Sequence, residues 1–222
     1  MNLKPFNSQI SIFLSDGIMN PIKFIDKFNV YFENLFTKED YLLKIDAEGI
    51  PDEVPLFKYS SSDGKYSYDF AKKRINFYLN FDENDSMDLF EEYKTRIKNV
   101  ISSFILEHSS ISRIGIAINY YIDKKDEKCK FWAEKYRLPF YDSKKTCVIS
   151  YNVNNNFTNR GIKYNDIISL SDAKIRQTKV VPVVSIDVNN VPVDDLSSDD
   201  LNYIFDEINN YKLDVVEGII NK

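Results

Sequence analysis

Residues 74–81 read Arg-Ile-Asn-Phe-Tyr-Leu-Asn-Phe and show the clearest alternation in the chain. Every second residue is apolar, and these residues are Ile75, Phe77, Leu79 and Phe81. A period of two places alternate side chains on opposite faces of a strand. The stretch therefore predicts a strand with one face in the core and the other face polar.

The same period appears on both sides of this stretch. Residues 8–14 and 114–120 alternate just as strictly, with isoleucine at most of the apolar positions. Pro182 interrupts another apolar run, and a proline within a strand favours an edge or a bulge. Further strands are predicted at residues 41–45, 145–153, 162–170 and 173–188.

Apolar residues at helical spacing predict three amphipathic helices. The first covers residues 21–36 and begins with an Asn-Pro pair, which suits an N-cap and a first turn. Asp85 or Ser86 begins the second helix, which continues to about His108. The third covers residues 197–220, and its acidic first turn suits the positive end of the helix dipole.

The order of the predicted elements repeats. Each half of the chain has a strand, a helix, further strands, a long strand and a long helix. The strand at Ile10 corresponds to the strand at Ile114, and the strand at Leu79 corresponds to the strand at Ile186. Any two amphipathic helices can be aligned with each other, so the repeat is also compatible with unrelated halves.

We therefore expect an α+β fold with a largely antiparallel sheet and long amphipathic helices. Residues 1–110 are expected to form an N-terminal half and residues 111–222 a C-terminal half. The two halves are expected to pack as one compact domain or as two closely packed related units.

Three residue counts exclude most familiar catalytic and metal sites. The chain has one histidine, two cysteines and six scattered glycines. These numbers exclude a multi-histidine metal centre, a four-cysteine zinc site and a glycine-rich phosphate loop. His108 ends a predicted helix, where an imidazole can bind the last carbonyls. No catalytic residue, metal ligand or cofactor site is predicted.

Charge is distributed unevenly along the chain. The net charge is −5, but residues 112–180 carry 14 basic and 7 acidic side chains, and residues 181–222 carry 2 and 9. This pattern fits two solvated faces, or a basic surface that binds an acidic surface of a partner or a second copy. The negative total argues against a general nucleic-acid-binding protein.

Residues 124–145 are the main candidate for a partner surface, because basic and aromatic residues alternate there. Such a mixture is typical of protein interfaces and of single-stranded nucleic-acid sites, and it also fits a surface helix that buries its aromatic side chains. The residues expected to bind a partner are Lys128, Lys130, Phe131, Trp132, Lys135, Tyr136 and Arg137, with Asp199, Asp200, Asp206 and Glu207 of the last predicted helix.

A metal-dependent nuclease or hydrolase is one alternative, since carboxylates far apart in sequence can converge on one ion. The nearest match to a nuclease pattern joins Pro51-Asp52 to Glu92-Tyr93-Lys94. Glu92 and Lys94 lie on a predicted helix, whereas such nucleases place these groups on a strand. The second alternative is a single-stranded nucleic-acid binder that uses residues 124–145.

Arg113-Ile114-Gly115-Ile116 opens the mid-chain strand, directly after a long predicted helix. With this motif and its final strand, acidic turn and helix, the chain resembles a sporadically distributed, uncharacterised family of small bacterial proteins. It differs at Ala117, where an arginine is common in that family. The resemblance implies no catalytic residue. Together with the Ile-, Asn- and Lys-rich composition of an AT-rich gene, it favours a phage-defence or toxin-related setting.

The leading hypothesis is a non-enzymatic protein-interaction or assembly subunit that needs no cofactor. It is expected to bind a protein partner or to self-associate as a homo-oligomer. The N-terminal residues lack the pattern of a signal peptide, and no apolar run is long enough to span a membrane. Two cysteines without a CxxC pattern fit a reducing compartment, so we expect a cytoplasmic protein that does not enter membranes.

Overall fold

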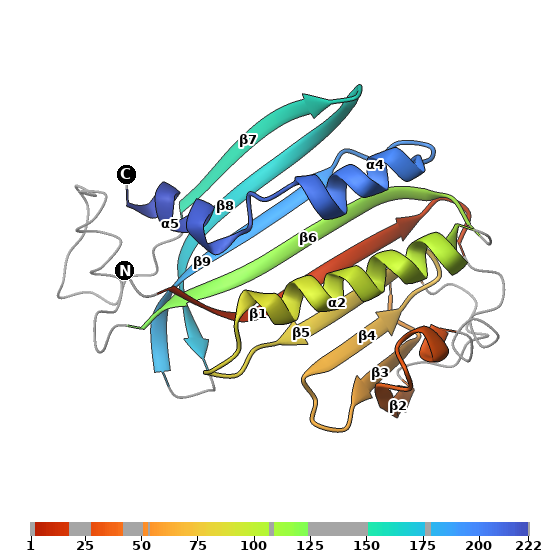
Figure 1. Cartoon of the computed structure of the whole chain (residues 1–222), viewed down its shortest axis with the longest axis horizontal. Coiled ribbons are helices and arrows are strands. Elements are labelled where there is room, and N and C mark those ends of the chain that lie inside the picture. Colours follow the sequence, from red (N-terminus) through yellow and green to blue (C-terminus); the bar gives the residue numbers. More distant parts are fainter. Residues whose placement is uncertain are drawn as a thin grey trace.

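One large antiparallel sheet dominates the computed structural model, which describes residues 3–17, 28–41, 51–52, 54–106, 109–123, 151–175 and 179–221. Its nine strands follow the order β2-β3-β4-β5-β1-β6-β9-β8-β7 (Figure 1). The strands are β1 (Leu3–Leu14), β2 (Phe36–Tyr41), β3 (Phe57–Ser61), β4 (Tyr66–Phe70), β5 (Arg74–Asn80), β6 (Ile111–Ile122), β7 (Tyr151–Asn159), β8 (Ile162–Ile175) and β9 (Lys179–Asn190).

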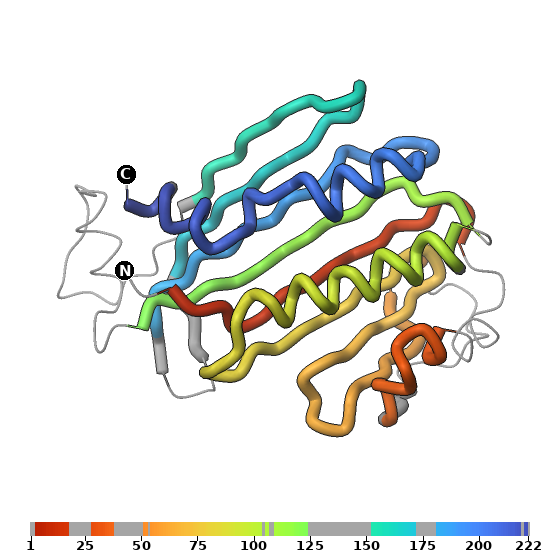
Figure 2. Tube along the Cα trace, viewed as in Figure 1, coloured from red at the N-terminus to blue at the C-terminus, as the bar shows by residue number. Residues whose placement is uncertain are grey.

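The labelled helices lie on one face of this sheet, with α2 over β5 and β1 and α4 over β6 and β9 (Figure 1 and Figure 2). The segments are α2 (Met87–Val100), π-helical η1 (Ile101–Ile105), α4 (Ser198–Asn202), π-helical η2 (Tyr203–Glu207) and α5 (Leu213–Ile220). Among the described residues, no helix combines the length and the apolar character that crossing a membrane requires.

The expected α+β fold with long amphipathic helices is wrong. One nine-stranded antiparallel sheet dominates the described residues, and the helices on it are short, with 14 residues in α2 and 8 in α5. The helix predicted over residues 197–220 divides because Ile208 has an extended backbone, with ψ at 117°, and Asn209 accepts a turn hydrogen bond from Lys212. Asparagine side chains compete for backbone hydrogen bonds, which disfavours a helix interior.

The N-terminal ends of the helices agree with the sequence. The Ser86 hydroxyl accepts a hydrogen bond from the Asp88 N–H at the start of α2. Ser197 begins α4 with a capping box, in which its side chain and that of Asp200 each bind the other residue's backbone N–H. Short polar side chains satisfy the free N–H groups of a first turn, so both boundaries were predictable.

Most of the predicted strands are present. Residues 74–80 form β5, and the alternating stretches at 8–14 and 114–120 lie within β1 and β6. Pro182 pairs with Asp172 of β8, while the β6–β9 ladder ends at Val183. The proline therefore lies just past the last described pair of β6 and β9, where its missing N–H costs the β6–β9 ladder no described pair. The predictions for residues 21–27, 42–45 and 145–150 fall outside the described residues.

The strands on the two sides of the central β1–β6 pair follow the same rule, because on each side the strands lie farther from the centre the earlier they occur in that half of the chain. From β1 outward the sheet continues through β5, β4 and β3, and from β6 outward through β9, β8 and β7. The matched strands at Ile10 and Ile114 are the two central ones, and those at Leu79 and Ile186 lie beside them. The two chain halves therefore meet in the middle of a single sheet.

The main hydrophobic core lies between the sheet and the helices. Ile75, Phe77 and Leu79 are fully buried, as the alternation predicts. The described residues 28–31 are helical, and Phe28 stacks on Phe77 with ring centroids 5.5 Å apart. Large aromatic side chains bury more apolar area than aliphatic ones, so this cluster stabilises the first half of the sheet.

Candidate interaction surfaces

The predicted acidic site lies on α4 and η2, and three of its four residues contact side chains or backbone of the same chain. Glu207, the fourth, is exposed. The other three carboxylates each have a partner within the chain. The pairs are Asp199 with Arg160 (3.2 Å), Asp200 with the Ser197 N–H (3.0 Å) and Asp206 with Lys98 (2.5 Å).

The predicted basic and aromatic site, from Lys128 to Arg137, lies outside the described residues, as does His108. Its role in partner binding stays a prediction.

The carboxylates of the nuclease-like pattern do not converge. Asp52 forms an ion pair with Lys73 at 3.5 Å, and Glu92 forms one with Arg96 at 3.0 Å. Lys94 is buried and points toward the C-terminal segment instead. Among the residues that the structure describes, no three His, Cys, Asp or Glu side chains are grouped closely enough to hold a metal ion.

Lys94 is the least expected polar residue of the core. Its ammonium donates to the Tyr211 hydroxyl at 2.5 Å and forms an ion pair with Glu91 at 2.5 Å. The Tyr120 hydroxyl donates to the backbone carbonyl of Tyr211. Burial raises the pKa of the Tyr211 phenol well above its usual value. One sequence signal was available, because Lys94 lies on the apolar side of α2, four residues after Phe90.

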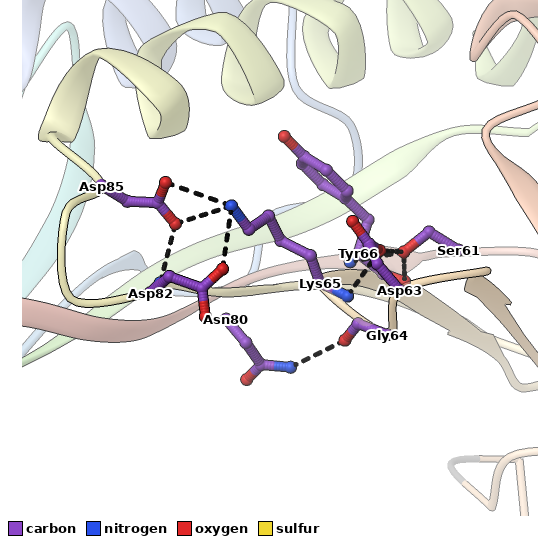
Figure 3. Close-up of polar contacts among 8 residues, drawn as sticks. All are labelled: Ser61, Asp63, Gly64, Lys65, Tyr66, Asn80, Asp82 and Asp85. Atoms are coloured by element: carbon purple, nitrogen blue, oxygen red, sulfur yellow. Dashed lines mark hydrogen bonds and ion pairs between the residues drawn. The ribbon is translucent and has the colours of Figure 1, made fainter.

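A second polar cluster joins the β3–β4 hairpin to the start of α2. Figure 3 shows the Lys65 ammonium between Asp82 and Asp85, at 3.3 and 2.8 Å. Burial alone would raise the pKa of Asp85, but hydrogen bonds from Lys65 and the Asp82 N–H hold this pKa below its usual value. These charged groups all have partners within the chain, so the cluster fastens two elements together.

The face of the sheet away from the labelled helices carries the alternate residues of each strand, because all of these helices lie on the other face (Figure 1). We call it the uncovered face. Its central part is rich in amides and hydroxyls. The residues are Asn7, Gln9, Ser11 and Phe13 of β1, Arg74, Asn76 and Tyr78 of β5, Arg113, Gly115, Ala117, Asn119 and Tyr121 of β6, and Ser185, Asp187 and Asn189 of β9.

Hydrogen bonds fix many of these side chains across neighbouring strands. Gln9 donates to Ser11 at 2.8 Å, and Ser11 donates to Asn76 at 2.8 Å. The Asn76 amide and the Tyr78 hydroxyl both donate to Asp69 at 2.7 Å. This network connects β1, β5 and β4. Asn76 and Asp69 are buried, with 1% and 8% of their surface exposed, and they hold the partly exposed side chains of Gln9, Ser11 and Tyr78 in place. A partner that contacts these three side chains therefore has little left to order.

A similar arrangement extends to the other half of the sheet. The Asn119 amide donates to Asn7 at 2.5 Å between β6 and β1. The Asn165 amide donates to Asn189, and the Asn189 amide donates to Asp187, both at 3.0 Å. Neutral donors therefore satisfy the acidic groups on this face, and the surface is ordered from β4 to β8.

Phe13 lies between two arginines at one end of the uncovered face. It pairs with Arg74 of β5 on one side and with Arg113 of β6 on the other. The guanidinium carbons lie 5.9 and 5.1 Å from the centre of the Phe13 ring. The Arg113 Nε is buried without a hydrogen-bond partner, and no described residue forms an ion pair with this arginine. The Arg113 side chain as a whole is partly exposed, so its terminal amino groups can donate to a bound acidic or carbonyl group.

Sequence reasoning found the parts of this site but not the site itself. Alternation places Arg74 on the polar side of its strand, and Arg113 begins the mid-chain motif. Phe13 is 61 residues from Arg74 and 100 residues from Arg113 in the sequence. Only the pairing of β1 with both β5 and β6 brings the three side chains together.

Comparison with known proteins does not identify the chain. It matches no known family model and no curated protein. Among solved structures, it is similar to the TBP of Methanococcus jannaschii, with 12% sequence identity over 98% of this chain and 99% of that chain, and a TM-score of 0.30. That TM-score is too low to show a shared fold, so it carries no argument about this protein.

Proposed function

We propose that this chain is a non-enzymatic protein-interaction or assembly subunit, and that the uncovered face binds its protein partner. The observation that carries this proposal is Phe13 between Arg74 and Arg113, within an ordered layer of amides and hydroxyls. Arginine and large aromatic residues contribute most of the energy at protein interfaces. The preformed layer lowers the entropic cost of binding.

The chemistry of the site indicates which part of a partner it accepts. The guanidinium of Arg113 can donate two parallel hydrogen bonds to a carboxylate, and Arg74 adds positive charge nearby. The partner segment that fits best is acidic, with apolar atoms that contact the Phe13 ring. Asp69 and Asp187 accept hydrogen bonds from neutral donors on the same face.

Single-stranded nucleic acid is the second candidate, because a base can stack on an aromatic ring while guanidinium groups contact phosphates. Phe13 and its two arginines favour it. The net charge of −5 and the carboxylates on the same face weigh against it, since phosphate binding depends on an excess of basic residues.

The cellular setting is proposed on other grounds. A cytoplasmic location and a phage-defence or toxin-related module rest on the composition and on the family resemblance at Arg113–Ile116. A second partner surface at Lys128, Lys130 and Lys135 is tested by reversing these three charges. Light scattering would then show whether assembly is lost.

The experiment that tests the uncovered face is capture from an extract of the native host. Immobilised wild-type protein is compared with Arg113→Glu, Phe13→Ala and Lys212→Glu. Lys212→Glu is the control for Arg113→Glu, because it changes the net charge by the same amount but lies on the helix-covered side of the sheet. We expect the wild type and Lys212→Glu to retain the same protein, and the two face variants to retain about tenfold less. Equal capture by all four would contradict the proposal.

Titration with a labelled single-stranded oligonucleotide separates the two candidates. A nucleic-acid site would show affinity that falls with salt, and the slope would decrease by about 0.7 in Arg113→Gln because one phosphate contact is lost. Protein capture without oligonucleotide binding would leave the first candidate. Circular dichroism on each variant confirms that the fold is retained.

A further inference from the structure

β7 forms one edge of the sheet, and its outer side has no partner strand among the described residues. Its inner side pairs with β8 at nine positions, from Tyr151 to Asn159. An edge strand presents a row of backbone N–H and C=O groups that can pair with another chain. Figure 1 shows β7 at the margin of the molecule, beyond the helices.

The sequence of β7 does not protect this edge. Natural edge strands usually carry charged residues or proline, which oppose pairing with a second chain. β7 reads Tyr-Asn-Val-Asn-Asn-Asn-Phe-Thr-Asn and contains neither. The opposite edge differs, because Lys38, Glu39 and Asp40 lie within the six residues of β2. Of the two sheet edges, β7 is therefore the one suited to pairing.

We propose that two copies of the chain pair through β7, antiparallel to each other, about a two-fold axis at Asn155. In this register Val153 lies opposite Phe157 of the partner copy, and Asn154 lies opposite Asn156. Two nine-stranded sheets then form one continuous sheet. The partner is a second copy because Val153 and Phe157 lie at equal distances on either side of Asn155, so a two-fold axis there pairs one with the other.

The positions of Val153 and Phe157 favour this register. Both are partly buried on the helix-covered side, where the Phe157 ring stacks on Tyr164 with centroids 5.1 Å apart. Pairing about Asn155 places each apolar side chain beside one from the other copy and covers both. If the register shifted by one residue, the side chains of Val153 and Phe157 in the two copies would lie on opposite faces of the joined sheet. Polar residues of the other copy would then lie opposite them. No charged side chain of β7 opposes another in this arrangement.

This inference rests on the proposed assembly function and adds self-association to it, but it uses neither Phe13 nor the arginines. The two proposals therefore fail separately. Light scattering that shows only monomers of the wild type would remove the dimer and leave partner capture unchanged. Equal capture by the uncovered-face variants would remove the binding face and leave the dimer.

Paired charge changes test the register directly. Asn154→Lys combined with Asn156→Lys places lysines opposite each other twice, so the dissociation constant of the dimer should rise about tenfold or more. Asn154→Lys combined with Asn156→Glu places opposite charges together, so the dimer should persist. Both positions are exposed in the single chain, which makes the two variants matched controls for folding. Equal masses for the two variants in light scattering would overturn the proposed pairing.

Cysteine cross-linking tests the position of the axis. In a background with Cys129→Ser and Cys147→Ser, Asn155→Cys should oxidise to a covalent dimer, because residue 155 meets itself at the axis. Asn152→Cys should remain uncross-linked, since Thr158 of the other copy lies opposite it. Cross-linking of Asn152→Cys at the same rate would place the axis elsewhere and overturn this register.

Discussion

Lys94 shows how one residue holds separate parts of the chain together. Its ammonium lies between α2 and the turn before α5, with 6% of the side chain exposed. A buried charge is tolerated only when opposite charges and hydrogen bonds replace water. Glu91 and Tyr211 supply these partners, so the C-terminal segment depends on a polar anchor as well as on apolar packing.

Tyr211→Phe removes one partner of Lys94 without changing the size of the core. We expect the free energy of unfolding to fall by about 1–2 kcal/mol, because the buried ammonium loses a hydrogen bond. Tyr203→Phe is the matched control. The Tyr203 ring packs on Tyr164, and this change should stay within about 0.5 kcal/mol. Urea unfolding measures both, and equal effects would exclude a special role for Tyr211.

Asp166 should make stability depend on pH in the opposite direction from an ion-paired carboxylate. It is 7% exposed, and its Oδ2 accepts a hydrogen bond from Asn210 at 3.1 Å. Burial raises the pKa of Asp166, although the bond from Asn210 opposes this. The folded protein therefore binds the proton more tightly than the unfolded chain does. Stability is fully present below the unfolded pKa and is lost as the pH rises through the folded pKa.

Asp166→Asn removes this titration. We expect the variant to be more stable than the wild type at pH 7 and equally stable near pH 3, where the wild-type carboxyl is neutral in both states. Urea unfolding across this range gives the difference. If the stability gain of the variant over the wild type instead increased as the pH falls, the folded protein would stabilise the charged form of Asp166.

Among the elements, the β7–β8 hairpin shows how a turn requires glycine. Its two turn residues, Arg160 and Gly161, have φ values of 50° and 82°. Positive φ at both positions is typical of a type I′ turn, whose twist matches that of the strands. Only glycine adopts such angles without strain from its side chain.

Two glycine-to-alanine changes should therefore have opposite signs. Gly161→Ala should lower the free energy of unfolding by about 1 kcal/mol, because alanine is strained at a φ of 82°. Gly218→Ala, inside α5, should raise it by about 0.5–1 kcal/mol, because alanine favours helices. The space around both glycines is open, so packing does not confuse the comparison. Thermal unfolding of both variants would show whether the signs differ.

The elements also show the limits of sequence reasoning. The alternation of Ile75, Phe77 and Leu79 predicted both β5 and its buried face, and serine caps marked two helix starts. The break at Ile208 was missed because the apolar spacing continues through it. The uncovered face was missed for another reason. Alternation assigns a side chain to one side of a strand but does not show which strands lie beside it or what covers them.

At the scale of the molecule, the pairing of β1 with β6 joins the two halves inside one sheet. Ile116 lies at this junction, 1% exposed, and pairs with Ile10 of β1 and Val188 of β9. A residue in the middle of a shared core affects both sides when it is removed. We therefore expect the halves to unfold together.

Ile116→Ala should lower the free energy of unfolding by about 2–5 kcal/mol and accelerate hydrogen exchange in β5 and β9 alike. Exposed Val191→Ala should change it by less than about 0.5 kcal/mol. Mass spectrometry of exchanged peptides follows both halves at once. Faster exchange confined to β9 would show that residues 1–110 and 111–222 unfold as separate units.

The β1–β6 pair also sets an order of events during synthesis. A ribosome completes β1 at Leu14 but must add almost a hundred more residues before β6 begins at Ile111. At usual elongation rates this takes roughly 5–20 seconds. During that interval β5 can already pair with one side of β1, while the other side stays open on the nascent chain. β1, which lies in the middle of the finished sheet, is thus an exposed edge strand until β6 has been synthesised.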